Sequence, residues 1–176
     1  MLRYITRSSG NIKNILNYKN MSMTERISNY FKTVKTINHL KYHQPQYTKR
    51  RLKELVKKNY CQLYETIMDR NVNELEKSCS TQLASFIKEH IELDIRIPFV
   101  IRDDLDYVKI KGARTYVEKR RGLVGYMYFT QITFQLNFRN YRNRFGYLKR
   151  QLVVMEKKET DKKDDDWSIC LIKEQQ

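Results

Sequence analysis

The clearest pattern in the sequence is an alternation of apolar and polar side chains between residues 128 and 139. The apolar set is Tyr128, Ile132, Phe134, Leu136 and Phe138. The polar set is Gln131, Thr133, Gln135, Asn137 and Arg139. Because successive side chains of a β-strand point to opposite sides of a sheet, the alternation predicts a long strand that is buried on one face.

The same two-residue period marks the rest of the C-terminal half, beginning near Leu105. Strands are predicted at residues 105–111, 114–119, 147–158 and 167–173. Gly112 indicates a bulge or bend between the first two of these segments. In the last strand, Trp167, Ile169 and Leu171 are expected on one face.

Residues 24–41 predict a basic amphipathic helix. Its apolar positions recur at spacings of three and four residues, at Ile27, Tyr30, Phe31, Val34 and Ile37. Lys32, Lys35 and Lys41 lie largely off that stripe. Such a helix lies on a bilayer or a partner, or packs against its own domain, and the sequence leaves these alternatives open.

Three further helices are predicted between residues 48 and 92. The first is capped by Thr48 and runs to Arg70. Its stripe consists of Leu52, Leu55, Val56, Tyr60, Leu63, Ile67 and Met68. Asn71 and Glu74 resemble a capping box for a short second helix. Ser80 caps the third helix, whose buried side is expected at Leu83, Phe86, Ile87 and Ile91.

This order of elements predicts an α+β fold. Three helices pack on one face of a curved, about four-stranded antiparallel sheet, which gives a cone-like shape. Pro45 interrupts the chain, so we place a boundary there. Residues 1–47 are predicted to form a basic N-terminal extension, and residues 48–176 the α+β domain.

Charge adds a functional signal to this fold. The formal net charge is +15 and the pI is about 9.7, which favours polyanionic partners such as nucleic acid or an anionic bilayer. Residues 139–151 (RNYRNRFGYLKRQ) hold five basic residues and no acid, with aromatic residues between them. The segment predicts a hairpin whose arginines bind phosphate and whose aromatics stack on unpaired bases. A solvated turn is the alternative.

Basic side chains elsewhere extend this predicted RNA-binding set. Lys49, Arg50 and Arg51 begin a helix, where positive charge opposes the helix dipole and is therefore expected to serve another purpose. The complete set is Arg139, Arg142, Arg144, Lys149, Arg150, Arg120, Arg121, Lys49, Arg50, Arg51, Arg3 and Arg7. The predicted membrane or partner face is formed by Lys32, Lys35 and Lys41.

The first 20 residues have the composition of a mitochondrial targeting segment, with basic and hydroxylated side chains and no acid. A basic tail that lies on a partner is compatible with the same composition. We expect residues 1–20 to be extended or irregular and to lie on a partner. Three widely spaced cysteines form no disulfide framework and no zinc motif, which fits a reducing compartment.

The C-terminal third resembles a known family. The segment RFGYLKRQLVVMEKKETDKKDDDWSICLIK is similar to the last hairpin and strand of the mitochondrial import-motor-tether domain family, which includes a protein of the large mitochondrial ribosomal subunit. The matching positions are Arg144, Phe145 and Gly146, then Val154, Met155 and Glu156, then Trp167 and Ile169. Met155 departs from the family pattern, which has an aromatic residue there. The resemblance implies a nuclear-transport-factor-2-like cone.

Two functions remain open at this point. The first is a structural constituent of the large subunit of the mitochondrial ribosome, which contacts rRNA and neighbouring ribosomal proteins in the matrix and faces the inner membrane. The second is a non-catalytic accessory subunit or adaptor of an inner-membrane complex. We expect no enzyme activity, cofactor or metal, because no nucleophile motif, phosphate loop or metal-ligand spacing is present. The sequence contains no run of 18 apolar residues and therefore predicts no transmembrane helix.

Overall fold

The structure is a computed structural model that describes residues 21–95, 97, 104–119, 126–139, 148–158 and 167–175. The elements are α2 (Met23–His43), α3 (Lys49–Met68), the 3-10 helix η2 (Val72–Glu74), α4 (Leu75–Ser78), α5 (Thr81–Glu92), β1 (Asp104–Lys119), β2 (Tyr126–Arg139), β3 (Leu148–Lys158) and β4 (Ser168–Gln175). The α+β class is confirmed, with four α-helices and four strands in the described part of the chain.

The four strands form one antiparallel sheet in the order β1-β2-β3-β4. β1 is continuous, and a register shift between Ile110 and Gly112 makes Lys111 an extra residue, so the predicted bulge is confirmed. β2 and β3 pair as far as Arg139 and Leu148 and form a hairpin. The turn residues 140–147 lie outside the described residues.

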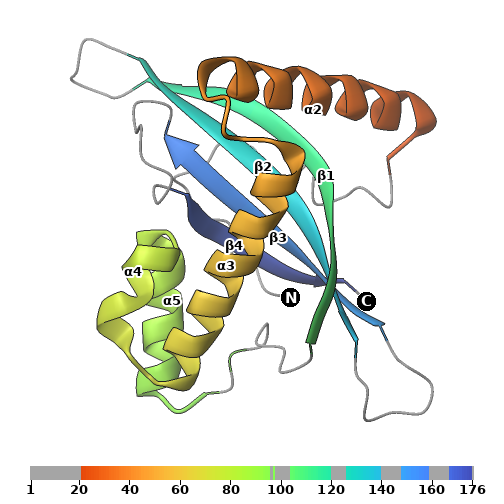
Figure 1. The fold of residues 1–176 in the computed structure, drawn as a ribbon. Helices are drawn as coiled ribbons and strands as arrows, with labels where there is room; N and C mark the ends of the chain where they lie inside the picture. Colours follow the sequence, from red (N-terminus) through yellow and green to blue (C-terminus); the bar gives the residue numbers. More distant parts are fainter. Residues whose placement is uncertain are drawn as a thin grey trace.

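Helices cover one face of this sheet (Figure 1). α3 runs diagonally across the strands, and α4 and α5 lie beside its C-terminal half. The four apolar residues predicted for the buried face of β2 are Ile132, Phe134, Leu136 and Phe138. All four are buried in one core with Leu55, Leu63 and Ile67 of α3, as predicted.

α3 matches its prediction closely. The Thr48 side chain accepts a hydrogen bond from the Arg51 amide at 3.1 Å and caps the helix. The apolar stripe is buried except for Met68. Two buried hydrogen bonds connect the helix to the sheet. The Asn59 amide donates to the Trp167 carbonyl at 2.8 Å, and the Tyr60 hydroxyl to Gln151 Oε1 at 2.8 Å.

α2 lies beside β1, the first outer strand of the sheet. The Asn29 amide donates to the carbonyl of the bulged Lys111 at 3.1 Å, and Thr33 Oγ1 accepts from the Ala113 amide at 3.1 Å. Ile37 and Leu40 belong to the main core. α2 is therefore packed against the strands. The predicted division of the chain into an extension, residues 1–47, and a domain, residues 48–176, stays a prediction.

The other outer strand, β4, is contacted by the segment between α4 and α5. The Ser80 amide donates to the Ile169 carbonyl at 2.9 Å, next to a bridge between Cys79 and Ile169. Ser80 also caps α5 through the Leu83 amide, as predicted. The capping box predicted at Asn71 is wrong, because the Asn71 side chain makes no cap bond and a 3-10 turn follows it.

The second face of the sheet is more buried than the sequence predicts, because β2 was expected to be buried on one face only. Gln131 and Thr133 are each 1% exposed, and Asn137 is buried as well. Arg114 donates two hydrogen bonds to Gln131 Oε1, and Gln131 Nε2 donates to Glu156 at 2.7 Å. Polar side chains that satisfy one another, as Gln131 does here, can be buried at low cost, whereas the buried Thr133 Oγ1 has no hydrogen-bond partner among the described residues. Alternation alone therefore does not show which face meets water.

The face assigned to Leu171 is also wrong. A register shift between Val154 and Met155 inserts Cys170 as an extra residue opposite β3. The bulge reverses the alternation, so that Ile169 and Ile172 lie in the main core while Leu171 joins Val154 in a small second cluster.

Candidate nucleic-acid interface

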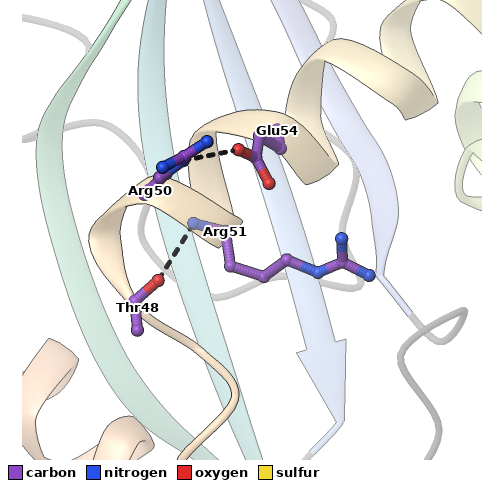
Figure 2. A network of polar contacts seen from close by, with 4 residues as sticks. All are labelled: Thr48, Arg50, Arg51 and Glu54. Carbon is purple, nitrogen blue, oxygen red and sulfur yellow. Dashed lines mark hydrogen bonds and ion pairs between the residues drawn. The ribbon is translucent and has the colours of Figure 1, made fainter.

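The first turns of α3 carry the basic residues Lys49, Arg50 and Arg51, all exposed, and no acid lies in the first turn. Arg50 Nε is 3.0 Å from Glu54 Oε1, one turn later. Figure 2 shows this ion pair, the Thr48 cap, and the Arg51 side chain extending away from both. Exposed ion pairs of this kind contribute about 0–1 kcal/mol, so a phosphate group can compete with Glu54 for Arg50.

A cleft of about 340 Å³ lies where this helix meets β1. Lys49, Lys53 and Lys57 repeat at intervals of four residues along its rim, opposite Tyr107. Lys53 Nζ lies 5.5 Å from the centre of the Tyr107 ring, and that ring is half exposed. We call this the α3 basic face, defined by Lys49, Arg50, Lys53, Lys57 and Tyr107. It combines cations with an exposed aromatic ring, as RNA-binding surfaces do, although Glu54 and Asp106 line the same cleft.

Arg139 is brought close to this region through Asp106, which lines the same cleft. Arg139 Nη2 lies 3.3 Å from Asp106 Oδ2, and both side chains are partly exposed. Residues 139–151 hold no acid, but Arg139 is paired with an acid from another strand. The sequence did not indicate this pair, because Asp106 is distant in sequence and becomes a neighbour only when β1 pairs with β2.

Arg150 belongs to a second group of cations, on β1 and β3. The pKa of Lys111 is lowered, first by partial burial and then by the charges of Lys109 and Arg150. Lys109 and Arg150 are exposed. An anion placed here would relieve the mutual repulsion of these three cations.

α2 and the sheet enclose a larger cavity of about 690 Å³, which we call the α2 cavity. Lys32 and Lys35, two of the three residues predicted for a membrane or partner face, lie in its wall. Lys41 is exposed and lies outside it. Lys157 also lines the cavity although it is only 2% exposed, and its Nζ donates to the Tyr47 hydroxyl at 2.9 Å.

The structure therefore places only part of the predicted RNA-binding set. Lys49 and Arg50 share one cleft, and Arg139 is linked to that cleft through Asp106. Arg51 is exposed but is not among the residues that line the cleft. Lys149 and Arg150 lie at the start of β3, both exposed. Six predicted residues lie outside the described residues: Arg3, Arg7, Arg120, Arg121, Arg142 and Arg144.

Several basic residues of these sites, among them Lys53, Lys57 and Lys157, were absent from the predicted RNA-binding set. Lys57 continues the four-residue spacing of Lys49 and Lys53, which is a visible signal. Lys157 shares the strand phase of Val153 and Met155, whose side chains are buried in the core. A lysine at a core-facing strand position is unusual, and it could have indicated a cavity.

The Cys61 and Cys79 thiols both have raised pKa values. Burial raises the pKa of the Cys79 thiol to about 12, and burial also raises the pKa of Cys61, so both thiols are poor nucleophiles at neutral pH. The described residues contain no group of three His, Cys, Asp or Glu side chains placed to bind a metal ion. None of the helices in the described ranges has the length and apolar character needed to cross a membrane.

Comparison with known proteins adds no family assignment. No protein-family model matches the chain, and no curated protein matches it significantly.

Proposed function

We propose that this protein is a structural, non-catalytic constituent of the large subunit of the mitochondrial ribosome and binds rRNA through its basic surfaces in the matrix. The observation that carries the proposal is the α3 basic face, where Lys49, Lys53 and Lys57 align beside the exposed ring of Tyr107. Lysines neutralise phosphates, and an exposed ring stacks on unpaired bases. The net charge of +15 supplies long-range attraction to the same partner.

The proposal includes the finer features of the fold. The sheet curves around the helix layer as a cone of the nuclear-transport-factor-2-like type, and the basic N-terminal extension contacts neighbouring ribosomal components. The order of helices followed by an antiparallel meander supports this part of the proposal. Membership of the import-motor-tether domain family rests on the C-terminal motif.

The direct test changes Lys49, Lys53 and Lys57 together to Gln. The triple variant should keep its fold, because these side chains lie at the surface, and should bind rRNA fragments more weakly. For each phosphate that the variant no longer neutralises, the slope of log affinity against log salt should fall by about 0.7–0.9. The slope is measured by fluorescence anisotropy between about 50 and 200 mM salt, a range over which such affinities change strongly.

The control changes Lys77 and Lys88 to Gln. These two lysines are exposed on α4 and α5 and lie within reach of Glu74 and Glu92. This variant should retain the salt slope of the unmodified protein. Cosedimentation with mitochondrial ribosomes, with and without RNase, provides the second readout. Equal slopes for both variants, together with sedimentation that RNase leaves unchanged, would contradict the rRNA proposal.

A second candidate function is that of an accessory subunit or adaptor at the inner membrane. It is favoured by the N-terminal half of α2, where Met23, Ile27, Tyr30 and Phe31 are exposed. Exposed apolar and aromatic side chains beside Lys32 and Lys35 are typical of helices that lie on anionic bilayers. Flotation of the protein with anionic vesicles after RNase treatment, reduced by Phe31→Ser, would favour this function over the first.

A further inference from the structure

The α2 cavity has basic groups along one wall. Lys32 and Lys35 are followed on the same helix by His39 and His43, whose ring centres are 4.4 Å apart. None of the described residues that line the cavity is acidic. Arg114 also contributes to the lining, but its guanidinium is directed to Gln131. An anionic group at this wall would therefore meet Lys32 and Lys35 without competition from a carboxylate of the lining.

Apart from Lys157, whose Nζ donates to the Tyr47 hydroxyl, the rest of the cavity offers surfaces for an uncharged body. Leu40 and Thr130 are buried wall residues, and Tyr128 is half exposed at the cavity. Gln44 lies in the wall as well, and its buried Oε1 accepts no hydrogen bond in the described part of the chain. A buried acceptor without a donor is costly, so a ligand that brings an N–H group would stabilise this wall after a small rotation of the amide.

We propose that the α2 cavity binds a nucleotide, with the phosphate at Lys32 and Lys35 and the base between Leu40 and Tyr128. A base has a flat apolar face for Tyr128 and N–H groups for Gln44, whereas an acyl chain offers no donor and a bare phosphate leaves most of the space empty. The volume of about 690 Å³ lies within the usual range for small-ligand sites, about 300–1,000 Å³. The nucleotide is either free or an unpaired residue of RNA, and only the second form rests on the proposed function.

In the test, the full chain is titrated separately with AMP, with adenosine and with inorganic phosphate, and calorimetry measures the binding. AMP should bind at least about tenfold more tightly than adenosine, a difference of about 1.4 kcal/mol, because adenosine lacks the charged group. Inorganic phosphate should bind weakly as well. Replacing both Lys32 and Lys35 by Gln should bring the affinity for AMP down to that for adenosine. Tyr128→Ala should weaken AMP and adenosine alike.

A control variant with Lys41 and Lys88 changed to Gln removes the same charge, and neither residue lines the cavity. It should bind AMP normally. The proposal is overturned if AMP does not bind at millimolar concentration, if the two double variants bind it equally, or if phosphatidylglycerol vesicles bind at this wall while AMP does not. The imidazole NMR signals of His39 and His43 should shift with AMP, and their invariance at saturation would place the ligand elsewhere.

A 5′-phosphorylated single-stranded oligonucleotide then identifies the source of the nucleotide. Displacement of AMP by the oligonucleotide assigns the cavity to RNA, and continued AMP binding assigns it to the free nucleotide. The α3 variant of Lys49, Lys53 and Lys57 separates this inference from the proposed function. If that variant binds rRNA fragments normally and still binds AMP, the function proposed for the α3 basic face has failed while the cavity assignment stands.

Discussion

α2 and α3 are consecutive basic helices with the same kind of sequence pattern, yet they meet the sheet differently. α3 crosses the strands and buries its apolar stripe from Leu52 to Ile67. α2 lies beside β1, and only its C-terminal half, with Ile37 and Leu40, reaches the core. In its N-terminal half, Phe31 is 65% exposed.

The difference shows what helical periodicity can and cannot establish. It identifies the residues that share a face of a helix. It does not show how much of that face the rest of the protein covers. Figure 1 shows the N-terminal end of α2 extending past β1, and the Ile27 and Phe31 side chains in this half of the helix are exposed. An apolar stripe on a helix is therefore a surface that needs a partner, and the partner can lie outside the domain.

The largest loss of stability on mutation is expected where α3 meets the sheet. Phe134→Ala should lower the free energy of unfolding by about 3–5 kcal/mol, because the ring is 1% exposed and leaves a cavity. Leu63→Ala on α3 should cost about 2–5 kcal/mol for the same reason. Urea unfolding followed by circular dichroism measures both. Met68→Ala, on the same helix but half exposed, is the control and should cost far less.

A smaller effect is expected where α2 meets β1. Thr33→Val keeps the shape of the side chain but removes the acceptor of the Ala113 amide. The loss should be about 1–3 kcal/mol, since a partly buried amide is left without its partner. Ser28→Ala, at an exposed position of the same helix, should change stability little. If the two variants unfold at the same urea concentration, α2 is not held to β1 through this bond.

The smallest effect on stability is expected in the exposed half of α2. Ile27→Ser and Phe31→Ser should leave the free energy of unfolding within about 0.5 kcal/mol of the original value, because neither side chain is packed in the core. Both should nevertheless weaken association with anionic vesicles or with ribosomes. A large loss of stability in either variant would mean that α2 is buried along its whole length.

The sequence predicted the elements of the fold well, because long periodic segments carry most of that information. The stripe of α3 and the core face of β2 follow directly from spacing. Capping by Thr48 and Ser80 follows from local chemistry. Leu171 could not be assigned to the correct face, because a one-residue bulge reverses every later side chain and the sequence around Cys170 carries no glycine signal.

The candidate site was less predictable, since its geometry depends on contacts between distant segments. Helical spacing places Lys49, Lys53 and Lys57 on one side of α3, although only Lys49 of the three was in the predicted set. The pair of Arg139 with Asp106 requires the strand register, and the burial of Gln131 requires its bonds to Arg114 and Glu156. Net charge indicates a polyanionic partner without showing which cations already have neighbouring acids.

The contact of α2 with β1 also bears on self-association. The outer strand of a sheet is a template on which another chain can add a strand, and natural proteins protect such edges. Here the side chains of α2 form hydrogen bonds with two backbone groups of the edge strand β1, the carbonyl of Lys111 and the amide of Ala113. On the opposite edge, the Ser80 amide forms a hydrogen bond with the carbonyl of Ile169 in β4. A chain without α2 should therefore form edge-to-edge oligomers, and any partner that draws α2 away from β1 also gains an open strand on which to build.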